Sequence, residues 1–287
     1  MSARSQPRPA VRSGRLPVRA IRFEYPDDTN PAWSPRFPEF AAAVNSVSLL
    51  MPFAEPYFVR SVRSALPQLD DELRAQAETY LKQELQHHVQ HRKFNSLVTQ
   101  RYPKVVRVEG WMRRTYAWLS HTRSQKFNLA FAAASETIAY SLARWTDRHV
   151  DQLFIGADPV PTTLFLWHLA EEVEHKTSAY DVYEAIDGSR LRYALAMFVT
   201  FSLLAWFTTI ATLTMLHQDH RAFYPVTYFR LFRWSMSFAF TLLPTMLASS
   251  LPGHHPSQFA DPLWLSAWLR QYDPETGLMP VPSLLLE

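Results

Sequence analysis

Acidic and imidazole side chains occur at helical spacing in the stretch QELQHHVQHRKFN, residues 83–95. Glu84, His87 and His91 are three and four residues apart, so in a helix they share one face, from which His88 is displaced. The rest of that face is apolar, which directs these ionisable groups toward the core. Burying a carboxylate and two imidazoles without partners costs several kcal/mol of the ~5–15 kcal/mol that stabilises a domain. A metal ion would offset this cost. The apolar stripe comprises Leu73, Ala77, Tyr80, Glu84, His87, His91, Phe94 and Val98.

A second stretch, LFLWHLAEEVEHKTSAYDVYEAI, repeats this arrangement. Glu172 and His175 have the same Glu-x-x-His relation, and His168 precedes them by one turn on the same apolar stripe. Glu171 and Glu174 lie about 100° away from that stripe, so we expect them to be solvated or to support the ligands from outside. Two helices therefore each offer a carboxylate and an imidazole at ligand spacing.

Two further helices offer one acid each on an apolar stretch. Glu136 lies among small residues in AFAAASETIAYSLA, where a neighbouring helix can approach closely, and Glu55 lies in MPFAEPYF. Two single glutamates and two Glu-x-x-His pairs are the ligand set of the di-iron and di-manganese carboxylate bundles. Four carboxylates balance two divalent cations, and the histidines leave positions open for water or dioxygen. The predicted ligands are Glu55, Glu84, His87, Glu136, Glu172 and His175.

The remaining polar residues of these helices have two interpretations each. His168 is either a seventh ligand or a partner of a ligand, and His91 is assigned more readily to the second role. Tyr140, one turn beyond Glu136, could donate a hydrogen bond within the site or be an ordinary core tyrosine. Asn95 and Asp181 are weaker candidates. The alternative to the whole site is a metal-free bundle with satisfied polar core residues.

These residues require long helices to position them. The periodicity predicts a helix from about residue 40 to 65, kinked or restarted near Pro52 and Pro56, and helices at about 72–98 and 124–150. Asp70 or Asp71 suits the N-cap of the second helix. A shorter helix at 111–120 precedes the third long one, and a fourth spans 162–186, stopped by Gly188. The fold class predicted is all-α: a ferritin-like four-helix bundle.

Beyond residue 192 the chain becomes strongly apolar. Residues 193–216 and 234–251 carry no charge and are each long enough to cross a bilayer, or to be buried on the bundle. We therefore expect four parts: a flexible basic arm (1–35), a di-metal bundle (36–190), a hydrophobic helical hairpin that is either buried or membrane-embedded (191–252) and a tail (253–287). The location expected is cytoplasmic, with membrane association through residues 193–251, and a homodimer is one further option.

Composition restricts the chemistry. The chain has no cysteine, so any metal must be held by His and carboxylate, which suits iron, manganese or zinc. A net charge of +3 does not favour nucleic-acid binding. The arginines before residue 24 form an acid-free tail, for which a transit peptide or an anionic-surface contact is the alternative to a disordered arm.

The chain resembles the ferritin-like family described as predicted metal-dependent hydrolases. The resemblance rests on LPVRAIRFEY, LLMPFAEPYFVRSVR, KQELQHHVQHRKFN, AAASETIAYSLA and WHLAEEVEHKTSAYDVY, and covers about residues 16–187. It implies a polar core of Glu55, Glu84, His87, His91, Glu136, His168, Glu172 and His175. We would expect Gly-Glu where this chain has Ala54-Glu55, followed by Pro56, which bears on the local geometry of Glu55. The segment around His168 also resembles the fourth helix of di-iron arylamine oxygenases.

Three functions fit these residues. The sequence favours an oxidoreductase in which two irons activate dioxygen with electrons from an unidentified donor and oxidise a small apolar substrate, because carboxylate-rich sites suit redox iron. A hydrolase would use zinc or manganese to activate a water, with Glu171 as base. A non-enzymatic iron-binding or membrane-linked bundle is the third.

Overall fold

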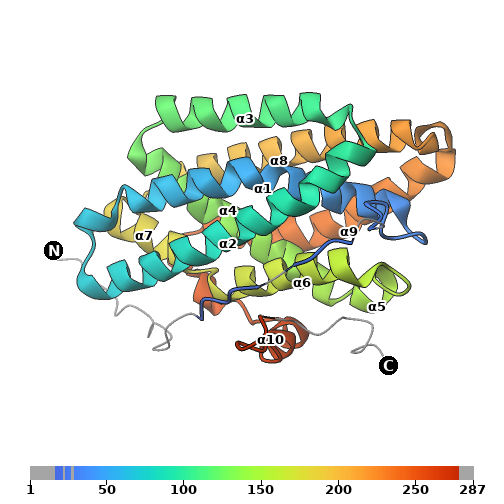
Figure 1. The fold of residues 1–287 in the computed structure, drawn as a ribbon. Coiled ribbons are helices and arrows are strands. Elements are labelled where there is room, and N and C mark those ends of the chain that lie inside the picture. Colours follow the sequence, from blue (N-terminus) through green and yellow to red (C-terminus); the bar gives the residue numbers. More distant parts are fainter. Residues whose placement is uncertain (1–16, 22, 27–28, 278–287) are drawn as a thin grey trace.

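The structure is a computed structural model that describes residues 17–21, 23–26 and 29–277. Long helices run back and forth across the molecule (Figure 1), and the predicted all-α class is confirmed. The helices are α1 (Pro38–Arg63), α2 (Asp71–Arg101), α3 (Val105–Thr122), α4 (Gln125–Asp147), α5 (Val150–Leu153), α6 (Pro159–Glu174), α7 (Ser178–Ile186), α8 (Arg190–Gln218), α9 (Pro225–Ser250) and α10 (Leu263–Leu269).

Helix α1 continues through both of its internal prolines. A proline at position i removes the N–H that would bond the carbonyl of residue i−4, so Pro52 leaves the carbonyl of Ser48 free. The side-chain amide of Asn95 on α2 donates to that carbonyl at 2.8 Å. A neighbouring helix thus supplies the missing hydrogen bond, and α1 needs no restart.

Helix α2 begins as the sequence predicts. The Asp70 side chain accepts a hydrogen bond from the backbone N–H of Leu73 at 2.9 Å and caps the first turn. Every residue of the predicted stripe is buried, including Glu84, His87 and His91. The apolar stripe, with its three ionisable residues, therefore faces the protein interior, as the periodicity indicated.

The single helix predicted over residues 162–186 is wrong: α6 ends at Glu174 and α7 begins at Ser178. His175 leaves the helical conformation, with φ −104° and ψ 17°. The buried ammonium of Lys176 donates to the Phe259 carbonyl and to the Asp261 carboxylate, both at 2.6 Å. This contact with the C-terminal segment holds the turn open, which local helix propensity alone does not indicate.

The core of the bundle is formed by four helical positions, occupied by α1, α2, α4 and the interrupted pair α6–α7. Helix α1 packs on α2 and α4, and α2 and α4 both pack on α6 and α7. The connecting helix α3, longer than predicted and continuous through Gly110, packs outside on α1 and α8. Helix α10 packs on α6, so part of the predicted C-terminal tail is built onto the bundle. This arrangement agrees with a four-helix core, and its ferritin-like classification stays a prediction.

Helices α8 and α9 pack along the bundle. Helix α8 lies against α1 and α4, α9 lies against α4, and the two also contact each other. Buried hydrogen bonds join α8 to the core, between Ser46 and Thr212 at 2.9 Å and between Thr137 and Tyr193 at 2.7 Å. Among the described helices, α8 alone is long and apolar enough to cross a membrane. An 18-residue stretch of α8 has a mean hydropathy of 1.9, and 28% of that stretch is buried.

Candidate metal centre

Donor atoms from three helices and one turn converge inside the bundle in two adjoining groups. In the first, one atom each from Glu84, His87, Glu172 and His175 all lie within 4.8 Å of one another. The second group is Glu55, His91 and His168, with the same limit on its distances. His168 Nε2 lies 2.9 Å from Glu172 Oε1 and so joins the two groups. Seven of the eight residues of the predicted polar core thus meet, and Glu136 is the one outside these two groups.

His87 is held by a carboxylate on its outer side. Its Nε2 donates to Glu171 Oε2 at 3.0 Å, which leaves the lone pair on Nδ1. That Nδ1 lies 3.6 Å from Glu172 Oε1 and 3.9 Å from Glu84 Oε1. Glu171, expected off the stripe, is therefore buried as the orienting partner of His87.

His175 has the same kind of support from α4. Its Nδ1 donates to Glu136 Oε2 at 2.9 Å, and the other Glu136 oxygen accepts from Tyr80 Oη at 2.7 Å. The free Nε2 faces Glu84 Oε1 at 3.5 Å. Both oxygens of Glu136 are engaged by protein donors, so in this geometry Glu136 orients His175, and its ligation of a metal stays a prediction.

His91 is oriented by a hydroxyl in place of a carboxylate. Ser48 Oγ donates its only proton to Asn95 Oδ1 at 2.7 Å, so the 2.8 Å contact with His91 Nδ1 requires that nitrogen to be the donor. The His91 Nε2 lone pair then points inward, toward His168 Nδ1 at 2.5 Å. Asn95 thus supports both the α1 backbone and, through Ser48, the tautomer of His91.

The inward atoms have no hydrogen-bond partners among the described residues, although they are buried. These atoms are both carboxylate oxygens of Glu55, Glu84 Oε1, His87 Nδ1 and His175 Nε2. Buried polar atoms are normally satisfied, and five that converge while their opposite sides are fixed are the pattern of ligands oriented toward a cation. The residues fit a metal centre.

The pKa shifts in the metal-free protein also agree with a cation site. Burial, together with Glu172 and Glu136, raises the pKa of Glu55 well above its ordinary value, and burial and Glu172 do the same for Glu84. Burial lowers the pKa of His87. Burial also disfavours the charged form of His175, but Glu136 and Glu172 outweigh it and raise its pKa to about 9. Protons thus take up part of the charge that a cation would neutralise.

A family comparison agrees with the presence of a metal centre. The profile of a family described as predicted metal-dependent hydrolases matches residues 17–260. The chain belongs to this family. The match begins at residue 17 and extends through α8 and α9, well beyond the resemblance visible in the bundle motifs, so the sequence that the family shares includes the apolar helices. Neither the curated proteins nor the solved structures contain a match to the chain.

The N-terminal segment contributes a residue that sequence reasoning did not assign to the site. Arg19 is buried and donates to Glu171 Oε1 at 3.0 Å, and it pairs with both oxygens of Glu174 at 2.6 and 2.9 Å. Gln83 and Gln90 of α2 donate to the carbonyls of Pro17 and Ile21, which fixes the segment in place. The described part of the predicted flexible arm therefore covers the centre, and residues 1–16 lie outside the described residues. The only indication in the sequence that this segment belongs to the site was the motif LPVRAIRFEY, which carries part of the family resemblance.

Two weaker candidates lie outside the centre. Tyr140 donates from its hydroxyl to the Ala260 carbonyl at 2.6 Å, stacks on Phe259 and lies under the Lys176 ammonium. The hydrogen bond that Tyr140 could have donated within the site, and with it a catalytic role, has no support in this geometry, because a backbone carbonyl outside the centre accepts from the hydroxyl. Asp181 pairs with His255 at 2.7 Å and holds the C-terminal segment to α7.

Proposed function

We propose that the protein is a metal-dependent hydrolase that uses the buried Glu and His cluster to hold its metal. The observation that carries the proposal is the set of unpartnered inward atoms, above all His87 Nδ1 and His175 Nε2, whose opposite ring nitrogens are each bound to a glutamate. Family membership supports hydrolysis over the oxidation chemistry that ligand composition alone favoured. A cation held by two imidazoles and two carboxylates, zinc or manganese by ligand type, would lower the pKa of a water and polarise a substrate oxygen.

The protein's own residues have distinct tasks in this proposal. Glu84, His87, Glu172 and His175 bind the cation, and Glu171 and Glu136 hold the two imidazoles in the tautomer that leaves the inward nitrogen free. Glu55, of the second donor group, has two unpartnered oxygens, one of them 3.8 Å from His168 Nδ1. Burial and the neighbouring carboxylates raise its pKa in the metal-free protein, and once a bound cation offsets those carboxylates Glu55 would accept a proton from a water or substrate hydroxyl. This assigns the base to Glu55 in preference to Glu171, whose oxygens are occupied by His87 and Arg19.

A dinuclear oxidoreductase is the second candidate. The observation that favours it is the direct contact between the two donor groups, through His168 Nε2 and Glu172 Oε1, which places a second ligand set beside the first. Two irons held by these two groups would supply oxidation chemistry and would need dioxygen and an external electron donor. The two candidates share ligands and differ in metal and co-substrate.

The deciding experiment combines metal replacement with two assays. Protein dialysed against a chelator is reloaded with zinc, manganese or iron(II). It is then tested on p-nitrophenyl esters and bis(p-nitrophenyl) phosphate, with and without dioxygen, while dioxygen uptake is followed in the presence of a chemical reductant. A hydrolase restores ester or phosphodiester cleavage with zinc or manganese, equally in the absence of dioxygen. Absence of cleavage with every metal, together with reductant-dependent dioxygen uptake by the iron form, would overturn the proposal in favour of the second candidate.

Adjacent histidines of α2 provide a matched pair of variants. His87 is fully buried with its Nδ1 turned inward, whereas His88 lies half-buried off the stripe. His87→Ala should lose bound metal and lower cleavage by at least about 100-fold, because a ligand is removed. His88→Ala should retain both within about twofold. Equal metal content in the two variants would refute the assignment of ligands.

A further inference from the structure

Helix α9 presents an apolar stripe to the outside of the molecule. Its members recur at intervals of three and four residues, which is one face of a helix. They are Phe229, Phe232, Met236, Phe240, Leu243 and Leu247. Phe240 is 80% exposed and Leu247 69% exposed, so nothing in the described chain covers this side. Contiguous exposed apolar area of this kind marks an interaction surface.

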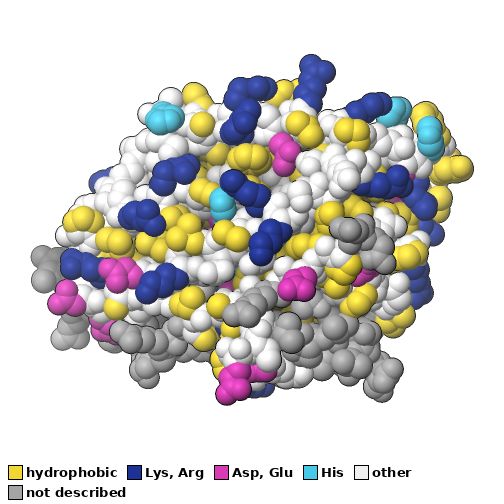
Figure 2. Space-filling view, viewed as in Figure 1, with side chains coloured by type: hydrophobic (Ala, Val, Ile, Leu, Met, Phe, Trp, Pro, Cys, Tyr) yellow, Lys and Arg dark blue, Asp and Glu magenta, His cyan; other side chains and the backbone are white. Residues whose placement is uncertain are grey.

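Helix α8 extends the surface. Leu191, Leu195, Phe198 and Trp206 are exposed along one side of α8, opposite the face that packs on α1 and α4. Because α8 and α9 contact each other and both lie on α4, their outer sides adjoin. We call this combined surface the α8–α9 face. The side of the molecule seen in Figure 2, which carries α1, α2 and α6, instead has Lys and Arg spread among its hydrophobic side chains.

The charge of this region is one-sided. Residues 190–251 contain five arginines and a single acid, Asp219, which is held by Arg101 at 2.9 Å and Tyr102 at 2.7 Å. Arg233 is exposed beside Phe232 and pairs with no carboxylate among the described residues. Arg190, Arg192 and Arg230 pair with Glu184, Asp187 and Glu39, so Arg221 and Arg233 are the arginines of this region without a carboxylate partner among the described residues. An apolar surface that carries such a cation suits a partner that is apolar inside and anionic at its edge.

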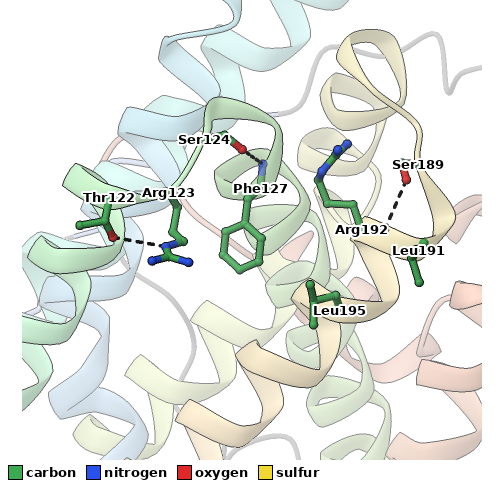
Figure 3. A pocket seen from close by; sticks show the side chains of 8 residues that line it. All are labelled: Thr122, Arg123, Ser124, Phe127, Ser189, Leu191, Arg192 and Leu195. Carbon is green, nitrogen blue, oxygen red and sulfur yellow. Dashed lines mark hydrogen bonds between the residues drawn. The ribbon is translucent and has the colours of Figure 1, made fainter.

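A surface pocket at the start of α8 has the same mixed character. About 410 Å³ in volume, it is bordered by Arg123 and Arg192, while Phe127, Leu191 and Leu195 supply apolar walls (Figure 3). Arg123 stacks over the exposed ring of Trp118, and Arg192 pairs with Asp187 at the helix start. The pocket lies where the apolar side of α8 meets cationic side chains, as at a membrane–water boundary.

We propose that the α8–α9 face rests on an anionic lipid surface, with its aromatic and aliphatic side chains in the outer acyl region and Arg233 among the headgroup phosphates. The protein would then be bound in the plane of one leaflet. Helix α8 does not leave the bundle to cross the bilayer, because the Ser46–Thr212 and Thr137–Tyr193 hydrogen bonds tie its inner side to α1 and α4.

A lipid surface suits the face better than a second copy of the chain does. A two-fold pairing through this face would bring Arg233 of both copies to one interface, and the only acid of residues 190–251 is already bonded to Arg101 and Tyr102. Anionic headgroups supply the missing negative charge. The outcome does not depend on which reaction the metal centre performs.

Vesicle flotation of the full-length protein tests the proposal. Vesicles of phosphatidylcholine alone are compared with vesicles containing phosphatidylglycerol, and the variant is the double substitution Phe240→Glu and Leu247→Glu. Both positions are highly exposed, so the fold is retained. The expected result is binding that is stronger to the anionic vesicles, and more than about tenfold weaker in the double variant. Arg233→Gln should reduce the preference for anionic lipid.

Exposed apolar residues outside the face provide the control. Val106→Glu on α3 and Leu85→Glu on α2 change residues that are 53% and 41% exposed, and both should float like the unaltered protein. Absence of vesicle binding, or equal loss in control and face variants, would overturn the proposal. So would light scattering that shows a dimer which Phe240→Glu dissociates while vesicles remain unbound, because a second copy would then cover the face.

Discussion

The metal-free protein should lose stability as the pH rises above 7, because folded His175 holds a proton that the unfolded chain releases. Burial disfavours the imidazolium, but Glu136 and Glu172 outweigh burial and raise the pKa of His175 from its ordinary 6.5 to about 9. A raised folded-state pKa stabilises the fold fully below 6.5, and this contribution disappears as the pH passes 9. The raised pKa values of Glu55 and Glu84 act in the same direction.

The size of the effect follows from these two pKa values. Between pH 7 and pH 9 the His175 proton accounts for a loss of about 2 kcal/mol in the free energy of unfolding. For a chain of 287 residues the unfolding entropy is about 0.6 kcal/mol/K, so the melting temperature should fall by about 3 °C. Burial lowers the pKa of His87 and of His91, so both stay neutral over this range and do not cancel the effect.

A bound cation should remove this dependence, because it occupies the inward nitrogen of His175 in place of the proton. Calorimetric melts at pH 7, 8 and 9 of chelator-dialysed and metal-loaded protein measure the difference. The gap between the two melting temperatures should widen with pH, and His175→Gln without metal should lack the His175 component. Equal melting temperatures at every pH, or a metal-free form that becomes more stable as pH rises, would refute the reasoning.

Two further predictions concern the supports of the centre. Arg19→Ala leaves the fully buried carboxylate of Glu171 without its guanidinium partner. The free energy of unfolding, measured by denaturant melts, should therefore fall by about 3 kcal/mol, and the metal affinity, measured by titration, by about 10–100-fold. Unchanged values would show that the N-terminal segment does not support the centre. Tyr80→Phe removes the 2.7 Å donor to Glu136 and should weaken metal binding, whereas Tyr140→Phe, which loses only a bond to a backbone carbonyl, should leave metal affinity unchanged. Equal effects of the two tyrosine variants on metal affinity would contradict the placement of Tyr80 beside the centre and of Tyr140 outside it.

Periodicity predicted the interior of the bundle well. The spacing of Glu84, His87 and His91 along an apolar stripe is a local property of α2, and such spacing decides which side of a helix is buried. The Asp70 cap and the helix stop before Gly188, whose φ is +62°, were also readable from residue type. These features depend on neighbours within a few positions.

The features that sequence reasoning missed depend on distant partners. The turn at His175 follows a stretch without glycine or proline, and it is held by Lys176 contacts with residues more than 80 positions away. The orienting contacts of Glu136 with His175 and of Glu171 with His87 have a similar origin, because which carboxylate meets an imidazole depends on how the helices are rotated in the bundle. Residue spacing along one helix contains no information on that rotation.

The Arg19 contact also bears on when the protein can become competent to bind metal. Arg19 and Glu171 are 152 positions apart, so during synthesis the N-terminal segment leaves the ribosome long before its partner exists. Long-range closures of this kind form late, since the intervening chain must first be ordered. The proposed metal centre can therefore be complete only after α6 has been made, and until then His87 of α2 lacks the Glu171 carboxylate that will orient it.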